Sequence, residues 1–126
     1  MENDEEDWHE IRMLDNRVRQ GHPLEMTEAV RELLRRTAPT VALDALETEA
    51  SVQDVARAKA LLQEMRRRIT EGSNRLSDSL HRMYRLRDEG DLDGARQQMR
   101  DVLAAEVVPL YREIAEGELA RLDERS

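Results

Sequence analysis

The sequence predicts an all-α protein: a long antiparallel helical hairpin with two shorter N-terminal helices packed on it, forming a helical bundle. Apolar residues recur at helical spacing along most of the chain. Phe is absent, so the core must come from Leu, Val, Ile, Met and Ala, which are mostly helix formers. The 126 residues suit one domain. We therefore expect a single domain over 1–126, with residues 1–6 frayed and an irregular connector over 37–50, in which Asp44 and Glu47 could begin one short helical turn.

The two N-terminal helices are predicted from periodicity and from their end signals. The first carries a stripe of apolar residues before Gly21 and Pro23, which punctuate its C-terminal end. The stripe is Trp8, Ile11, Leu14 and Val18. The second helix has Thr27 as its N-cap and is expected to end before Pro39, because a proline ring disfavours the helical conformation of the preceding residue.

A long helix is predicted from about residue 51 to about residue 88. Its stripe keeps a three-four alternation without a phase break, which favours one continuous helix. The stripe is Val55, Ala58, Leu62, Met65, Ile69, Gly72, Leu76, Ser79, Met83 and Leu86. Gly72 would then allow another backbone to approach or mark a bend. The alternative is two helices that meet at Gly72, because Gly72 and Ser73 also resemble a helix stop followed by a cap.

The chain is expected to reverse at 90–94, with Asp91 capping the returning helix. Pro109 lies inside the returning pattern and should either kink that helix or begin a new one. Counting outward from the reversal places Gly72 opposite the Pro109 region. We expect one buried stripe across Gly72, packed against the returning chain. The two sets are Leu62, Met65, Ile69, Leu76, Leu80 and Met83, and Met99, Leu103, Val107, Leu110 and Ile114.

The charge balance argues against several classes of partner. The net charge is -8, which disfavours nucleic acids and anionic membrane surfaces. No cysteine is present, so the chain has no disulfide and no thiolate site. The acidic start is unlike a signal peptide, and no apolar run approaches the length of a membrane span. We therefore expect a cytoplasmic protein whose partners are neither nucleic acid nor membrane.

Two histidines follow a carboxylate at the spacing that helical di-iron proteins use for their ligands. The pairs are Glu6 with His9 and Asp78 with His81. Such a site also needs carboxylates on partner helices, all of them on buried faces. Leu80, beside His81, is the residue expected to face the core. The interpretation favoured here is surface histidines, and no metal site is predicted.

The reversal also resembles part of a calcium-binding loop. Glu89, Asp91 and Asp93 fall at loop positions one, three and five. Arg96 and Arg100 then occupy positions eight and twelve, where their charges would repel the ion. The pattern therefore predicts a capped turn without calcium.

No catalytic motif is present. The run 66–68 of three arginines lies on a helix that must also bury Met65 and Ile69. Solvation and pairing with acidic neighbours are its expected roles, and a phosphate-binding patch is the minor alternative because the net charge is negative. Neither a nucleophile elbow, a phosphate-binding loop nor a helical zinc motif occurs. We predict no enzyme, no catalytic residue and no cofactor.

Several stretches together resemble the DUSAM domain, a family of myxobacterial paralogues of unknown function. The matching stretches are 30–35, 40–43, 68–73 with Arg75 and Leu76, 90–96 and 107–112. The resemblance covers the chain from about Trp8 to about Leu122. It implies no catalytic residue and no ligand, and it leaves the function unknown.

The leading functional hypothesis is a non-catalytic helical protein–protein interaction or regulatory module, with a homodimer as one form of it. Its candidate partner contacts are Trp8, Val41 and Leu43: an aromatic near the N-terminus, and an apolar run between Pro39 and Asp44. The alternative is a helical metal- or small-ligand-binding protein built on the histidine–carboxylate pairs.

Overall fold

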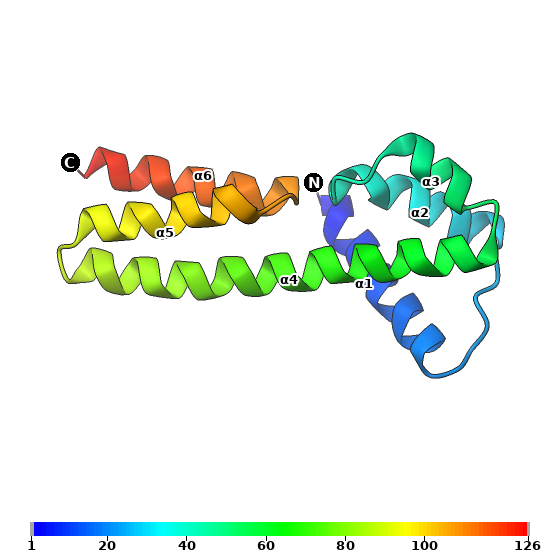
Figure 1. Ribbon diagram of the computed structural model, residues 1–126. Helices are drawn as coiled ribbons and strands as arrows, with labels where there is room; N and C mark the ends of the chain where they lie inside the picture. The colour runs from blue at the N-terminus through cyan, green and yellow to red at the C-terminus, as the bar shows by residue number, and fades with distance from the viewer. Residues whose placement is uncertain (1, 126) are drawn as a thin grey trace. The chain divides into compact units, whose positions relative to one another are not determined.

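The computed structural model describes residues 2–125, and side chains from residue 4 onward, as an assembly of helices (Figure 1). Within these residues there are six helices and no strand. The helices are α1 (Glu2–Arg19), α2 (Glu28–Thr40), α3 (Ala45–Ser51), α4 (Val55–Asp88), α5 (Leu92–Ala105) and α6 (Pro109–Glu124). The prediction of an all-α helical bundle is confirmed.

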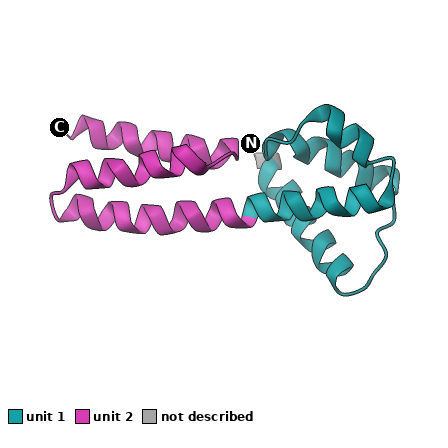
Figure 2. Ribbon diagram, viewed as in Figure 1, with its two compact units in different colours: residues 1–69 teal, residues 70–126 magenta. Residues whose placement is uncertain are grey.

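The chain divides into two compact units, Met1–Ile69 (unit 1) and Thr70–Ser126 (unit 2), shown in Figure 2. Unit 1 contains α1, α2, α3 and the first part of α4, and unit 2 contains the rest of α4 with α5 and α6. The expected single domain over 1–126 stays a prediction. None of the helices, over the described residues, is both long and apolar enough to cross a bilayer.

Helix α1 begins earlier than predicted. Residues 2–6 are helical rather than frayed. Asp4, Glu5 and Glu6 lie near the start of the helix, and carboxylates stabilise a helix N-terminus through its macrodipole. The helix ends as expected before Gly21, whose φ of 97° belongs to the left-handed conformation that closes many helices.

Helix α2 begins at the predicted cap but ends later than expected. The Thr27 hydroxyl oxygen accepts a hydrogen bond from the Val30 amide at 3.2 Å. Pro39 lies inside the helix, which continues to Thr40. The ring is tolerated there because only the last turn loses an amide donor. The Thr40 hydroxyl also donates to the Thr37 carbonyl at 2.6 Å, which satisfies one C-terminal acceptor.

The expected irregular connector over 37–50 is wrong over most of its length. Residues 37–40 belong to α2, and α3 occupies Ala45–Ser51. The capping prediction was right, because the Asp44 carboxylate accepts from the Glu47 amide at 3.0 Å. Only 41–44 remain outside helices, and there Ala42 has a left-handed φ of 61°.

Helix α4 is continuous over 34 residues, so the single-helix prediction holds and Gly72 does not end a helix. The helix starts at Val55 rather than near 51, because α3 and a turn occupy 51–54. The Asp54 carboxylate accepts from the Ala56 amide at 3.1 Å and so satisfies one amide of its first turn.

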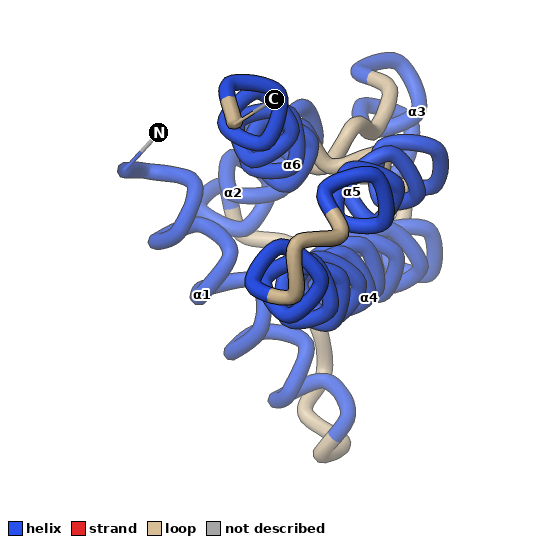
Figure 3. The backbone as a smooth tube through the Cα atoms, turned by 90° about the vertical axis from the view of Figure 1, so that its left-hand side faces the viewer, coloured by secondary structure: helices blue, strands red, loops and turns tan. Residues whose placement is uncertain are grey.

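Unit 2 is a three-helix arrangement in which α4, α5 and α6 lie side by side (Figures 1 and 3). The chain reverses at Gly90, which has φ 87°, and Asp91 caps α5 by accepting from the Gly94 amide at 2.8 Å. Residues 106–108 are non-helical, and Pro109 occupies the first turn of α6. Of the two outcomes expected at Pro109, the new helix is the one observed.

Each unit has its own buried apolar residues. In unit 1 these are Trp8, Ile11, Leu14, Leu24, Leu33, Leu34, Ala38, Val41, Val52, Ala58, Leu61, Leu62, Met65 and Ile69. In unit 2 they are Leu76, Met83, Ala95, Met99, Val102, Val108, Tyr111, Ala115 and Leu122.

Of the six residues on α4 expected to be buried across Gly72, all are buried except Leu80, which is half-buried. At the ends of the longer apolar stripe, Val55 is exposed and Leu86 is half-buried. On the returning chain, Val107 and Ile114 are exposed and were wrongly assigned to the core. The break at 106–108 restarts the helical phase, so α6 buries Tyr111, Ala115 and Leu122 instead.

Candidate interaction surface

Two of the three predicted partner contacts belong to the core of unit 1. Trp8 is 4% exposed, and its indole Nε1 donates to the Thr40 hydroxyl at 3.0 Å. Val41 is fully buried. Neither side chain is presented to a partner in this conformation, which corrects the sequence interpretation. The physical reason is that the end of α2 covers the N-terminal aromatic, a contact 32 residues apart in sequence.

Leu43, the third predicted contact, is half-buried. It lines a hollow of about 190 Å³ between α2 and α3. Arg35 and Glu49 face each other at this hollow, with 2.8 Å between the guanidinium Nε and a carboxylate oxygen. Leu43 therefore keeps partial access to solvent, although the adjacent charges are already paired with each other.

The histidines of the two predicted pairs lie on the surface. Glu6 and His9 on α1 are exposed, as are Asp78 and His81 on α4. Across residues 2–125 no group of three or more potential protein ligands gathers in a way that could hold a metal ion.

The acidic residues of the reversal take part in capping and ion pairs. Asp91 caps α5, while Asp93 and Asp123 both contact Arg96, each with 2.9 Å between nitrogen and oxygen. Arg96 also donates to the Leu122 carbonyl near the end of α6. Arg96, one of the two arginines expected to repel calcium, thus joins the start of α5 to the end of α6.

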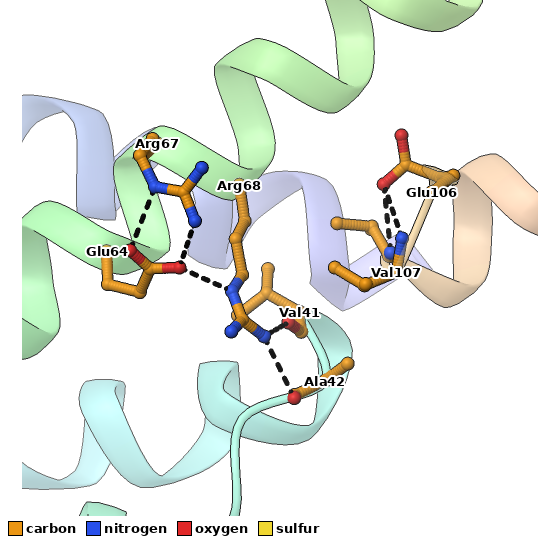
Figure 4. Close-up of polar contacts among 8 residues, drawn as sticks. Val41, Ala42, Glu64, Arg67, Arg68, Glu106 and Val107 are labelled. Carbon is orange, nitrogen blue, oxygen red and sulfur yellow. Dashed lines mark hydrogen bonds and ion pairs between the residues drawn. The ribbon is translucent and has the colours of Figure 1, made fainter. Parts of the chain in front are cut away.

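Two arginines of the run 66–68, Arg66 and Arg68, join α4 to other segments of unit 1, and Figure 4 shows the contacts of Arg68. Arg68 donates to the carbonyl oxygens of Val41 and Ala42, both at 2.9 Å. These two carbonyls follow α2 and lie at the left-handed Ala42, where no helical amide is available to them. Arg68 thereby fixes the end of α2 to α4.

Arg66 makes a second connection, between α4 and α1. It donates to the Arg12 carbonyl at 3.2 Å and lies 3.4 Å from the Asp15 carboxylate. Asp15 is fully buried, and one of its oxygens also contacts Arg19 at 2.8 Å. Its other oxygen, Oδ1, has no hydrogen-bond partner. The predicted role of the run, pairing with acidic neighbours, is confirmed for these contacts.

Glu64 supports two of the three arginines. Its carboxylate accepts from Arg67 Nε at 2.9 Å and from Arg68 Nε at 2.7 Å (Figure 4). The hydrogen bond from Arg67, followed by that from Arg68, lowers the pKa of Glu64 from 4.5 to about 2, against the opposing effect of burial. Glu64 therefore stays ionised under any ordinary condition and holds Arg68 toward the end of α2.

This shift predicts a pH-dependent stability. The folded-state pKa of Glu64 is depressed, so its contribution is complete above about pH 5 and is lost as the pH falls toward 2. Glu64→Gln should be less stable than the parent at pH 7 by about 1 kcal/mol, since the side chain is 31% exposed and solvent screens the pair. In urea unfolding the difference should shrink as the pH falls.

The matched control is Glu25→Gln, an exposed carboxylate between α1 and α2. It should change stability little at any pH in this range. A Glu64→Gln deficit that stayed constant from pH 7 to pH 2 would contradict the assignment.

An apolar groove runs between α1 and α2 of unit 1, with a volume of about 290 Å³. Its lining is His9, Glu10, Met13, Leu14, Arg17, Ala29, Val30 and Leu33. Leu14 and Leu33 are buried in its floor, while Met13 is 46% exposed. His9, Glu10 and Arg17 supply charged or polar groups at its margin. An apolar floor with a charged margin can take up an apolar side chain or a helix of another protein.

The sequence interpretation did not identify this groove. Its one sequence signal is Met13, an apolar residue outside the stripe that α1 turns toward the core. Met13 is flanked by Glu10 and Arg17, three residues before it and four after it. All three therefore lie on the same exposed face of the helix.

Unit 2 contains a buried carboxylate where α5 passes into α6. Glu106 is 3% exposed, and one of its oxygens accepts from the amides of Val107 and Val108 at 3.1 and 2.9 Å (Figure 4). Its other oxygen accepts from Arg75 of α4 at 2.7 Å. These amides precede α6, whose N-cap Val108 has no capping side chain. Glu106 therefore acts as a structural cap.

Gly72 lies against the segment that joins α5 to α6, in agreement with its predicted position opposite the Pro109 region. An added Cβ would lie 2.5 Å from Cδ2 of Tyr111 and 2.9 Å from Oε1 of Glu106. Both neighbours are buried. Gly72 is thus a close-contact glycine in a continuous helix, but its neighbours are side chains rather than the expected backbone.

A hollow of about 400 Å³ in unit 2 lies near the C-terminal ends of α4 and α6. Its arginines include Arg87, which lies over the Tyr84 ring and contacts Asp88, and Arg121, which pairs with Glu118. Cations at helix C-termini offset the partial negative charge of the last carbonyls. Arg87 and Arg121 are therefore already paired with neighbouring carboxylates.

The comparisons with known proteins identify the family. A family model described as "Protein of unknown function (DUF2379)" matches residues 6–122. No curated protein and no solved structure shows a significant match. The matched range includes residues of both units and all six helices. The chain therefore belongs to the DUF2379 family, whose function is unknown.

Proposed function

We propose that the chain is a non-catalytic helical interaction or regulatory module that binds a protein partner through the groove between α1 and α2. The supporting observation is the exposed Met13 in an apolar groove with a charged margin. A flexible thioether adapts to different partner surfaces and is common where a helix is recognised.

The charged clusters that could suggest chemistry have structural roles in the described part of the chain. Arg68 and Glu106 satisfy backbone groups at helix ends, and Arg66 joins α4 to α1. This use of the strongest polar contacts supports a scaffold rather than an enzyme. No observation favours the alternative of a metal- or small-ligand-binding protein.

Three further points belong to the proposal. The resemblance over 30–35, 90–96 and 107–112 supports membership of the DUSAM domain family. The net charge of -8 supports a protein partner over nucleic acid or an anionic membrane. The absence of cysteine is compatible with a cytoplasmic setting.

The test compares three forms of the tagged full chain in the cells that naturally express it, by in-cell cross-linking and quantitative mass spectrometry. The forms are the parent, Met13→Glu in the groove, and Leu46→Glu. Leu46 is the control because it is 81% exposed on α3 and does not line the groove. Proteins captured by the parent and by Leu46→Glu should be lost with Met13→Glu, because a carboxylate in the apolar groove must be desolvated on binding.

Circular dichroism should show that all three forms remain equally helical. Identical sets of captured proteins from folded parent and folded Met13→Glu would reject the groove as the interaction site.

A further inference from the structure

We infer that the groove between α1 and α2 takes a second copy of this chain, with the two α1 helices antiparallel across a two-fold axis near Met13. This inference rests on the proposed function, because it names a partner for the same groove. It is carried by the distribution of charge along α1.

The charges of α1 are separated by sign along its length. Its acidic residues lie within 2–10, with Asp15 as the exception, and its three arginines lie within 12–19. Asp15 is fully buried and contacts Arg19 and Arg66, so it adds no free negative charge to the surface. The exposed face of α1 is therefore negative toward its start and positive toward its end.

The exposed stripe of α1 is nearly symmetric about Met13. The stripe is Glu6, Glu10, Met13 and Arg17, and Gln20 continues it just after the helix ends. In an antiparallel pair centred near Met13, Glu10 of each copy lies opposite Arg17 of the other, and the two Met13 side chains meet between them. A parallel pair would place like charges opposite each other and is disfavoured.

The groups that would pair are available. Arg17 has no ion pair within the described residues. Within the same residues, the one ion-pair partner of Glu10 is Arg36, at 3.8 Å. The Glu10 side chain is 58% exposed and the Arg36 side chain 50% exposed. By contrast, Arg36 also pairs with the more buried Asp7 at 3.0 Å, so it retains a partner if Glu10 turns away.

The size of the contact sets its strength. A helix of 18 residues is about 27 Å long. A contact confined to α1 and the edge of α2 would fall below the roughly 1,200 Å² buried by a standard stable interface. We therefore expect a reversible dimer with a dissociation constant in the micromolar range, weakened by salt because its charge pairs lie at the margin.

The experiment is charge reversal with mixing, followed by sedimentation equilibrium of the full chain at about 5 to 200 µM. The parent should self-associate. Glu10→Arg and Arg17→Glu alone should each weaken self-association about tenfold or more, because every cross pair becomes repulsive. An equimolar mixture of the two variants should restore association, since both cross pairs of the mixed dimer are again of opposite charge. In one pair Arg at position 10 faces Glu at position 17, and in the other the unaltered Arg17 faces the unaltered Glu10.

The mixture separates this inference from effects within one chain. Carboxylates at the start and arginines at the end of α1 also stabilise the helix itself, so either variant alone could alter folding. Recovery on mixing cannot arise within one chain. The Met13→Glu variant should not self-associate, whereas the Leu46→Glu variant should self-associate as the parent does.

A parent that remains monomeric at 200 µM would overturn the inference, and so would a mixture that associates no better than its components. Either result leaves the proposed function intact if capture of other proteins still depends on Met13. If the mixed variants regain association but no other protein is captured through Met13, the groove binds a second copy of the chain and the proposal of a different protein partner is rejected.

Discussion

Gly72→Ala is expected to destabilise the protein by about 1 to 3 kcal/mol, the usual cost of overpacking a well-filled core. The new Cβ would lie 2.5 and 2.7 Å from two carbons of the Tyr111 ring. Tyr111 is 8% exposed, so its ring has little room to move away. Urea unfolding followed by circular dichroism measures the loss, and Gly72→Leu should cost more.

Gly117→Ala is the matched control, because Gly117 also lies inside a helix. A Cβ there would meet only Arg121 Nη2, at 3.9 Å. Helix propensity alone should then stabilise the protein by up to about 1 kcal/mol. If both alanine variants were at least as stable as the parent, the close contact at Gly72 would be ruled out.

Glu106→Ala is the second large effect, with an expected loss of about 3 kcal/mol. The substitution leaves the amides of Val107 and Val108 without their acceptor and Arg75 without its buried partner. Hydrogen bonds to a charged group contribute about 1.5 to 3 kcal/mol each. Arg75 is 34% exposed, so water can replace part of the interaction that it loses.

Glu106→Gln should fall between Ala and the parent, because the amide oxygen still accepts from the backbone but its nitrogen cannot accept from Arg75. Glu113→Ala, at an exposed position of α6, should be nearly neutral. Equal stability of Glu106→Ala and Glu113→Ala would show that the buried carboxylate does not cap α6.

The parts of the fold that depend on local chemistry were predictable. The phase across Gly72 indicated one helix, and the side chains of Thr27, Asp44 and Asp91 cap the helices expected to follow them. The errors occur where distant contacts decide. The prediction continued the apolar spacing of α5 into α6 as if the two were one helix. Residues 106–108 are non-helical, so a different face of α6 turns toward the core and Ile114 is exposed.

The candidate site was harder to predict because exposure depends on tertiary packing. Trp8 near the N-terminus and Val41 between two helices resembled surface anchors, yet contacts with distant segments bury them. Met13 lay outside the core stripe and was overlooked, although an apolar residue between opposite charges on a polar face was its available signal. The buried role of Glu106 had no local signal, since Arg75 is 31 residues away.

The arginine contacts of α4 also have a consequence for synthesis on the ribosome. A chain made from its N-terminus completes α1, α2 and α3 before Arg66 and Arg68 have been translated. The carbonyl oxygens of Val41 and Ala42 must therefore stay hydrated until α4 emerges, because their donors lie 27 and 26 residues further along. The N-terminal unit thus completes its hydrogen bonding only when the helix that it shares with the C-terminal unit is already being made.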